Sequence, residues 1–124
     1  MSENKEIVVL SAVRTAIGTY GGSLAGTPPT ELAATCVKAA VERAGIEPAD
    51  VGHAAFGNVI HTEPKDMYLS RVAAVRGGLP VETPAVTVNR LCGSGLQAVV
   101  SAMIDERRPQ AIFDRIVYTL IEFT

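Results

Sequence analysis

One cysteine stands where a short apolar run gives way to a glycine-rich turn. Cys92 follows the apolar run at residues 85–89 and is succeeded by Gly93, Ser94 and Gly95. The spacing of apolar residues predicts a strand before this turn and a helix after it, so the thiol lies at or next to a helix N-terminus. Unpaired backbone N–H groups and the positive end of the helix dipole favour a thiolate there, and the thiolate is the nucleophilic form of cysteine.

The residues around this thiol permit two interpretations. In the first, Gly93 and Gly95 leave space for a substrate carbonyl to approach the sulfur, and a backbone N–H donates to the resulting oxyanion. Asn89 and Ser94 complete the set expected to support the turn, which resembles the strand–turn–helix arrangement of a serine nucleophile elbow. In the second interpretation Cys92 is a buried, inert residue, and the glycines serve close helix–strand packing. Residue spacing alone leaves both interpretations open.

The other residues capable of chemistry form no clear motif. Cys36 lies on the apolar stripe of a predicted helix and is expected to be a small core residue, with no disulfide to Cys92 in a reducing compartment. His53 and His61 have no metal-binding spacing; each is either a general base brought close by folding or a loop histidine in solvent. Of the two, His61 is the better candidate for a functional residue, because it follows a strand at the end where ligands bind in parallel sheets. The glycines at 93–95 lack the lysine of a P-loop and the third glycine of a dinucleotide motif. The sequence therefore predicts no metal and no cofactor site.

Strands and helices alternate in the predicted secondary structure. The predicted strands are residues 7–10, 54–60 and 85–89, and the predicted helices are residues 28–44, 66–76 and 92–103. This β-α-β-α-β-α order predicts an α/β fold with a largely parallel sheet. The first helix has the clearest ends, because Thr27 is expected to cap it, Pro28 suits its first position and Gly45 supplies a left-handed stop.

Composition excludes several classes of protein. The chain has 124 residues, with 11 basic and 13 acidic side chains (11 − 13 = −2), and 48% of its residues are hydrophobic. These values exclude a disordered chain and indicate one compact domain. The near-neutral net charge does not indicate a basic surface that would bind nucleic acid or an anionic membrane. No apolar run is long enough to span a bilayer. The N-terminus does not resemble a secretory signal, so we expect a cytoplasmic protein.

Three stretches of the sequence resemble the thiolase family, close to the β-ketothiolase and acetyl-CoA acetyltransferase group. They are residues 6–22, residues 55–59 and, most specifically, residues 88–98. The resemblance implies that Cys92 takes an acyl group from an acyl-CoA as a thioester. The group then passes to acetyl-CoA to make a 3-ketoacyl-CoA, or the reverse thiolysis occurs. It also implies a five-layer αβαβα fold of two similar halves, assembly into dimers or tetramers, and no cofactor beyond the CoA thioester substrates.

The sequence also departs from the family pattern. Family members carry in their second half the histidine of a Gly-His-Pro motif, the cysteine of a Cys-x-Gly motif, and an asparagine and histidine that bind the enolate oxygen, and no position here matches them. We therefore expect residues 1–104 to be a partial thiolase N-terminal domain that is inactive alone.

Residues 105–124 look like a divergent tail, as a truncation or frameshift would produce. Within it residues 116–121 fit a strand, and Ile112, Ile116, Val117, Leu120 and Ile121 fit one face of a helix equally well. The alternative function is a non-catalytic fragment that associates with full-length thiolase subunits. A small cysteine hydrolase or redox protein ranks last, because no histidine or resolving cysteine is evident beside Cys92.

Overall fold

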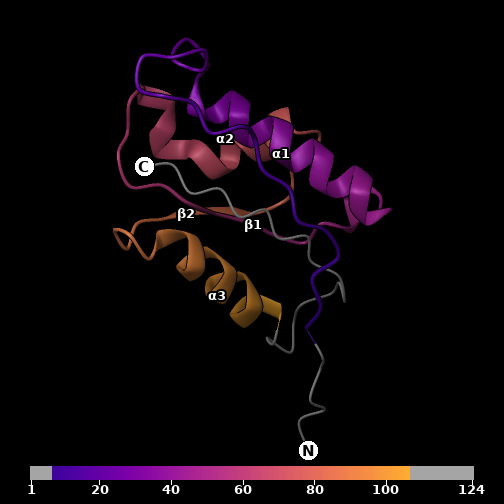
Figure 1. Cartoon of the computed structure of the whole chain (residues 1–124). Coiled ribbons are helices and arrows are strands. Elements are labelled where there is room, and N and C mark those ends of the chain that lie inside the picture. The colour runs from indigo at the N-terminus through magenta and orange to yellow at the C-terminus, as the bar shows by residue number, and fades with distance from the viewer. Residues whose placement is uncertain (1–6, 107–124) are drawn as a thin grey trace, which may run out of the picture.

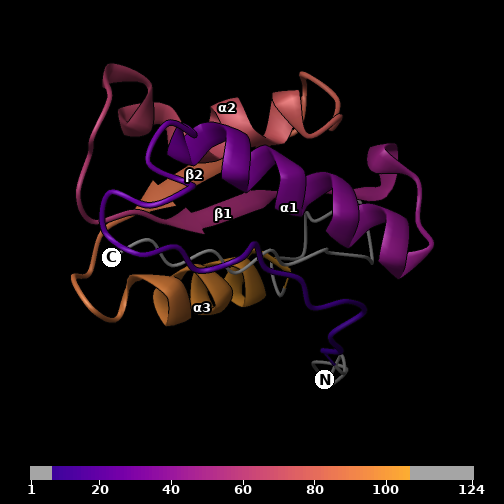
Figure 2. The same cartoon turned by 45° about the horizontal axis from the view of Figure 1, so that its top comes forward.

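A two-stranded parallel sheet lies between helices on both of its faces. The computed structural model describes residues 7–106. The helices are α1 (Pro29–Ala44), α2 (Leu69–Arg76) and α3 (Ser94–Glu106), and the strands are β1 (Ala54–Gly57) and β2 (Ala85–Val88). The strands pair in parallel, from Ala54 opposite Ala85 to Gly57 opposite Val88. Helices α1 and α2 cover one face of the pair and α3 covers the other (Figures 1 and 2). The predicted α/β class with parallel strands is confirmed.

Helix α1 begins one residue later than expected. Its N-cap is Pro28, whose φ of −58° and ψ of 142° are not helical, and no side chain caps it, so the predicted cap at Thr27 is wrong. The physical reason is Pro29, because a proline ring excludes the residue before it from the helical region. The predicted stop is confirmed, since Gly45 has a φ of 67° and its N–H bonds to the carbonyl of Glu42.

The first predicted strand is not formed. Residues 7–10 have no regular secondary structure, and the side chains of Val8 and Val9 are 54% and 75% exposed. An isolated β-branched run gains neither ladder hydrogen bonds nor burial, and strand propensity is mainly a preference for such surroundings. The segment is instead tied to α1, where the Ser11 hydroxyl donates to the carbonyl of Ala40 at 2.8 Å. The order in the described residues is therefore α-β-α-β-α.

The remaining elements match the predictions in type and differ at their ends. Both strands are shorter than expected, because β1 stops at Gly57 and β2 at Val88. Two short 3₁₀ turns, Pro48–Asp50 and Pro64–Tyr68, precede β1 and α2. Helix α3 starts two residues later than predicted and continues to Glu106. Residues 107–124, with the predicted strand-or-helix ambiguity, lie outside the described residues, so the divergent tail stays a prediction.

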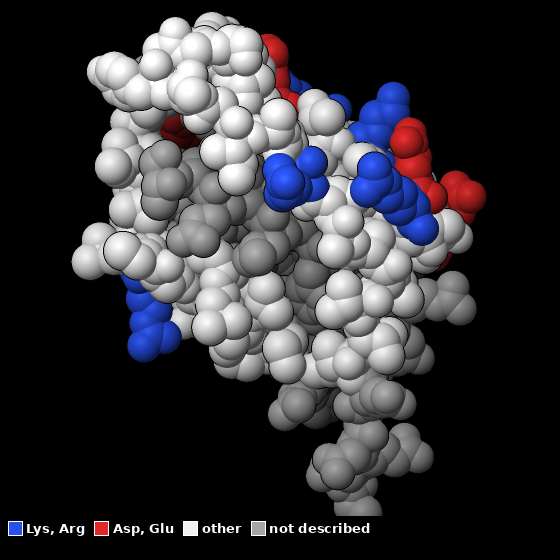
Figure 3. All heavy atoms as spheres, in the orientation of Figure 1, with Lys and Arg blue, Asp and Glu red and all other residues white. Residues whose placement is uncertain are grey.

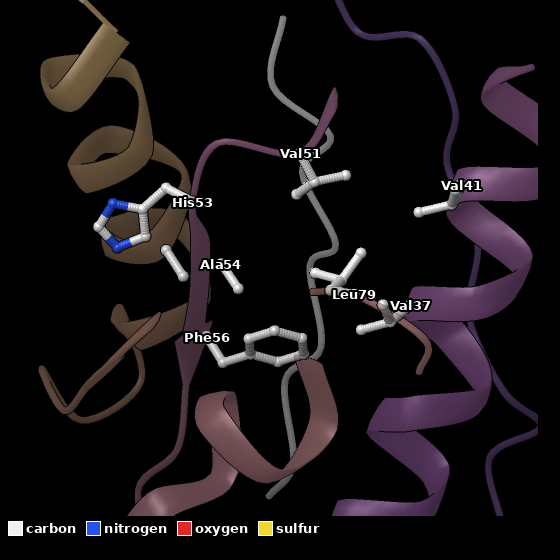
Figure 4. A pocket seen from close by; sticks show the side chains of 8 residues that line it. Val37, Val41, Val51, His53, Ala54, Phe56 and Leu79 are labelled. Atoms are coloured by element: carbon white, nitrogen blue, oxygen red, sulfur yellow. The ribbon is translucent and has the colours of Figure 1, made fainter. Parts of the chain in front are cut away.

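The main core lies between β1 and the pair of helices α1 and α2. Figure 4 shows Val37, Val41 and Leu79 converging with Phe56, while His53 points to the other side of β1, toward α3. These apolar side chains line a cavity of about 10 Å³. A space of this size holds at most one water molecule, and its apolar lining offers few polar partners. The cavity is therefore a packing defect of the core and does not suit a substrate.

Helix α3 packs against the sheet with small side chains. Ser94, Ala98 and Ala102 are buried against the sheet side, whereas Leu96 and Ile104 are 72% and 53% exposed. Of the large apolar residues whose spacing predicted this helix, Leu96 and Val100 are exposed, and Val99 and Met103 are half-buried. Small residues on the inner face allow the helix backbone to approach β1 closely.

Charged side chains are sparse on the face shown in Figure 3. Basic and acidic groups lie next to one another over α1, and most of the remaining described surface in this view is uncharged. No helix within the described residues combines the length and apolarity needed to cross a bilayer.

The close contact between α1 and α2 yields a stability prediction. A Cβ added at Gly77 would lie 2.5 Å from the Cβ of Val37 and 2.8 Å from the carbonyl oxygen of Ala73. We expect Gly77→Ala to lower the free energy of unfolding by about 1–3 kcal/mol, the usual cost of an overpacked core. Urea denaturation followed by circular dichroism measures this difference. Gly26→Ala is the matched control, because a Cβ there meets no atom within 4 Å. Equal effects of the two substitutions would contradict the packing argument.

Candidate active site

Cys92 is exposed and lies at the carboxyl edge of the sheet. It follows the end of β2 at Val88 and precedes the first residue of α3, Ser94, by two positions. In parallel α/β sheets ligands bind at this edge, where the loops after the strands converge. The thiol is thus accessible next to a helix N-terminus, and it does not face an apolar interior.

The hydroxyl of Ser94 closes the turn that carries Cys92. This hydroxyl is buried, accepts a hydrogen bond from the backbone N–H of Arg90 at 2.8 Å and donates one to the carbonyl of Leu91 at 2.6 Å. Two backbone bonds reinforce the turn, from the N–H of Gly93 to Arg90 and from the N–H of Ser94 to Leu91. These two N–H groups are therefore already bonded within the turn. The expectation that a backbone N–H of this turn donates to an oxyanion stays a prediction.

Asn89 holds a strained residue in place immediately before the cysteine. Leu91 has a φ of 49°, in the left-handed region that a branched side chain rarely adopts. The Oδ1 of Asn89 accepts the Leu91 N–H at 3.0 Å, and its Nδ2 donates to the carbonyl of Val59 at 3.3 Å. A left-handed residue costs about 1–2 kcal/mol, so it persists only where neighbouring contacts enforce it. Strain of this kind collects at functional sites.

The two glycines of the turn have different surroundings. Gly93 is exposed, and a Cβ there would meet only the carbonyl oxygen of Arg90 at 3.5 Å, an ordinary contact. Gly95 is buried in the first turn of α3. Gly95 thus lies inside the fold, whereas Gly93 borders open space beside the thiol. The functional roles of Cys92 and its neighbours stay predictions.

The second cysteine belongs to the core, as predicted. Cys36 is 3% exposed on the buried side of α1, and both thiols are free. Burial raises the pKa of the Cys36 thiol above its ordinary value, and a hydrogen bond with the backbone of Thr15 opposes this shift only in part. A buried thiol with a raised pKa is a poor nucleophile, so Cys36 is an internal reference against which reactivity of Cys92 can be measured.

The histidines lie at opposite ends of β1. His53 precedes the strand, at the amino edge of the sheet, so the strand separates it from the turn of Cys92. His61 follows the strand at the carboxyl edge and is exposed. It shares that edge with Cys92, yet no hydrogen bond joins the two residues in the described structure. The described geometry therefore does not supply a general base for the thiol.

A buried carboxylate that we did not predict organises the loop after β1. The Oδ2 of Asp66 accepts hydrogen bonds from the backbone N–H of Thr62 (2.8 Å), the hydroxyl of Thr62 (2.9 Å) and the backbone N–H of Glu63 (2.9 Å). Its backbone carbonyl accepts from the Nδ2 of Asn58 at 3.1 Å. The spacing of Glu63 and Asp66 is that of a capping box, which is the sequence signal that could have found it.

Opposing effects act on the pKa of Asp66. Burial raises the pKa of this carboxyl, but the hydrogen bonds from Glu63 and Thr62, with a smaller contribution from His61, together lower it below the ordinary value of 3.8. Asp66 is therefore ionised at neutral pH despite being fully buried.

Comparison with known proteins identifies the family. Residues 7–106 match the thiolase N-terminal domain. The chain belongs to the thiolase family. It is 64% identical over 98 residues to the beta-ketothiolase BktB of Cupriavidus necator, a match that covers 79% of this chain and 25% of that protein. It is 41% identical over 95 residues to human mitochondrial 3-ketoacyl-CoA thiolase, covering 77% of this chain and 24% of that protein.

Solved thiolase structures share the fold. The crystal structure of human mitochondrial 3-ketoacyl-CoA thiolase in complex with CoA matches with a TM-score of 0.77 and 39% identity, covering 80% of this chain and 25% of that one. The thiolase resemblance and the α/β fold predicted from the sequence are confirmed. The chain spans about a quarter of the length of these relatives.

The thiolase match contains the turn of Cys92 together with Asn89, Gly93, Ser94 and Gly95. Within residues 7–106 no group of three or more His, Cys, Asp or Glu side chains is arranged to hold a metal ion.

The hydroxyl of Ser94 provides one test of the turn. Ser94→Ala removes both hydrogen bonds of this buried hydroxyl, one from the backbone N–H of Arg90 and one to the carbonyl of Leu91. We expect the free energy of unfolding to fall by about 1–3 kcal/mol, because each of the two lost hydrogen bonds contributes about 0.5–1.5 kcal/mol. Urea denaturation measures the loss. Ser101→Ala in the same helix is the control, because its hydroxyl only accepts a bond from the Gln97 side chain. A loss no larger than that of the control would contradict the role of Ser94.

The depressed pKa of Asp66 predicts a pH dependence of stability. A carboxyl with a lower pKa when folded stabilises the protein above its unfolded value of 3.8, and this contribution is lost as pH falls through the folded value. We therefore expect Asp66→Asn to be less stable than the wild type at pH 7, with the difference shrinking below about pH 4. Urea midpoints at pH 7, 5 and 3 measure it. Asp50→Asn, which affects one bond in an exposed turn, should cost less at pH 7. A gap between wild type and Asp66→Asn that does not change with pH would count against the prediction.

Proposed function

We propose that this chain supplies the acyl-accepting cysteine of a thiolase-type acyltransferase. The observation that carries the proposal is the exposure of Cys92 on a rigid turn, two residues ahead of α3 at the carboxyl edge of the sheet. The Sγ of Cys92 attacks the thioester carbonyl of an acyl-CoA, the C–S bond to CoA breaks, and the thiol proton leaves with CoA. The α-carbon of acetyl-CoA, after losing a proton, then attacks the acyl–cysteine thioester. The products are a 3-ketoacyl-CoA and the free thiol, and the reverse direction is thiolysis.

The chemistry suits a sulfur nucleophile. Both the donor and the acyl-enzyme are thioesters, so the acyl group moves between sulfurs of similar leaving ability and the transfer is reversible in two steps. The similar proteins named beta-ketothiolase and 3-ketoacyl-CoA thiolase support CoA thioesters as the substrate class. The turn contributes position, because the side chains of Ser94 and Asn89 hydrogen-bond the backbone of Arg90 and Leu91, the two residues before Cys92.

The described residues do not complete the reaction. Proton removal from the thiol and from acetyl-CoA needs general bases, and no histidine of the described structure is hydrogen-bonded to Cys92. Each acid or base group contributes about 10²–10⁴-fold to such rates. We therefore propose that the chain by itself accepts an acyl group but does not turn over.

Acetyl-CoA provides the direct test of this proposal. We expect incubation with acetyl-CoA to add one acetyl group to Cys92 and none to Cys36, because only Cys92 is accessible. Peptide mass spectrometry locates the group, and Cys92→Ala should remove it. We expect no measurable thiolysis of acetoacetyl-CoA.

Two results would contradict the proposal in different ways. Iodoacetamide modification of Cys92 without acetylation would show that the thiol is accessible but is not an acyl acceptor. Thiolysis within about tenfold of a full-length thiolase would show that no further acid–base group is needed, contrary to the usual size of such contributions.

A second candidate function is non-catalytic association with full-length thiolase subunits. The exposed large apolar residues on the outer face of α3, Leu96 and Ile104 above all, favour it, because such a face gains stability when covered. Sedimentation that shows only a stable monomer would count against this candidate.

A further inference from the structure

The end of β1 contacts the turn of Cys92 through its backbone. A Cβ built on Gly57 would lie 2.7 Å from the carbonyl carbon of Ser94, 2.9 Å from its oxygen and 2.8 Å from the nitrogen of Gly95. These distances are too short for any real side chain. All three neighbours are backbone atoms of the first turn of α3, so no flexible side chain can move aside. The first turn of α3 therefore packs directly on the glycine.

Space alone requires a glycine at this position. Gly57 is a strand residue of β1, paired with Val88, and it is not among the described glycines with positive φ. Its backbone conformation is thus open to any residue. The contact with Ser94 and Gly95 is the reason that a larger residue does not fit.

The two residues after Gly57 make further contacts with the same region. The N–H of Asn58 donates to the carbonyl of Val88 at 3.0 Å, and the carbonyl of Val59 accepts from the Nδ2 of Asn89 at 3.3 Å. Residues 57–59 therefore contact the end of β2, the residue that holds Leu91, and the start of α3. Cys92 lies between the second and third of these contacts in the sequence.

We propose that Gly57 is a positioning residue for Cys92. Its missing side chain lets α3 begin close to β1, and Ser94 transmits that position to the turn, because its hydroxyl binds Arg90 and Leu91, the two residues before the thiol. The inference rests on the proposed function in so far as a defined thiol position serves acyl transfer. A side chain at position 57 displaces Ser94, and the thiol then moves relative to the N-terminus of α3.

Three glycine substitutions separate positioning from stability. Gly57→Ala creates the clash beside Cys92, Gly77→Ala creates an equally tight clash with Val37 in the core, and Gly26→Ala meets no atom within 4 Å. The probe is iodoacetamide, and peptide mass spectrometry follows Cys92 and Cys36 separately over time. Buried Cys36 reports global unfolding, because it reacts only when the core opens.

We expect only Gly57→Ala to change the reaction of Cys92 in the folded protein. Its rate should fall by roughly two- to fivefold, the size of a helix-terminus effect on a nearby charge, while Cys36 stays protected. Gly77→Ala should raise the rate at Cys36 and leave that at Cys92 within about twofold of wild type, because exposure of Cys92 does not depend on the core. Gly26→Ala should match the wild type at both cysteines.

The outcomes that overturn the inference are distinct. An unchanged rate at Cys92 in folded Gly57→Ala removes the positioning role. Trimethylamine N-oxide favours the compact state and is added to rescue a destabilised variant. If Cys36 still reacts in Gly57→Ala under this condition, Gly57 is required by the whole fold, and its local role is overturned. Failure of the proposed function is recognised separately, because wild-type Cys92 would then react with iodoacetamide but not with acetyl-CoA.

Discussion

The contact between the first turn of α3 and the end of β1 is the constraint on which the candidate site depends. Parallel pairing of β1 with β2 places Gly57 and Val88 at one edge of the sheet, so the chain leaving β2 starts its helix beside the end of β1. Backbone atoms of Ser94 and Gly95 occupy the space that a side chain of Gly57 would need. The position of Cys92 follows from this contact, because only two residues separate the thiol from the start of the helix.

The two faces of the sheet are packed in different ways. On one face Phe56 packs against buried apolar side chains of α1 and α2, such as Val37 and Leu69. On the other face α3 contributes small buried residues such as Ala98 and Ala102, whereas its Leu96 and Ile104 are exposed. Close approach brings more backbone atoms into contact with the sheet, whereas bulky side chains would move the helix away. Helix α3 therefore buries less side-chain area on this face, but its distance from the sheet is set by direct backbone contact.

Polar side chains that bond to the backbone complete the carboxyl edge. Asp66 accepts three hydrogen bonds with one oxygen and, through its carbonyl, binds the side chain of Asn58. Asn89 connects the loop after β1 to the strained Leu91. The buried Asp66 and Asn58 would destabilise the fold if their partners were removed, so their bonds restrict the loop after β1 to one arrangement.

Local signals in the sequence determined the helix stop at Gly45, the alternation of helices with strands and the strand–turn–helix placement of Cys92. These features depend on neighbours within a few positions, so residue type and spacing are enough to predict them. Membership of the thiolase family was indicated instead by the resemblance of three sequence stretches to that family, and the match over residues 7–106 confirms it. Only the tertiary structure decided that residues 7–10 do not pair, that Leu96 faces outward and that Asp66 is buried. Strand pairing and burial depend on which segments meet in space, and periodicity shows that a helix has an apolar stripe without showing what covers it. The role of Gly57 belongs to the same class, because its clash involves a helix that begins 37 positions later in the chain (94 − 57).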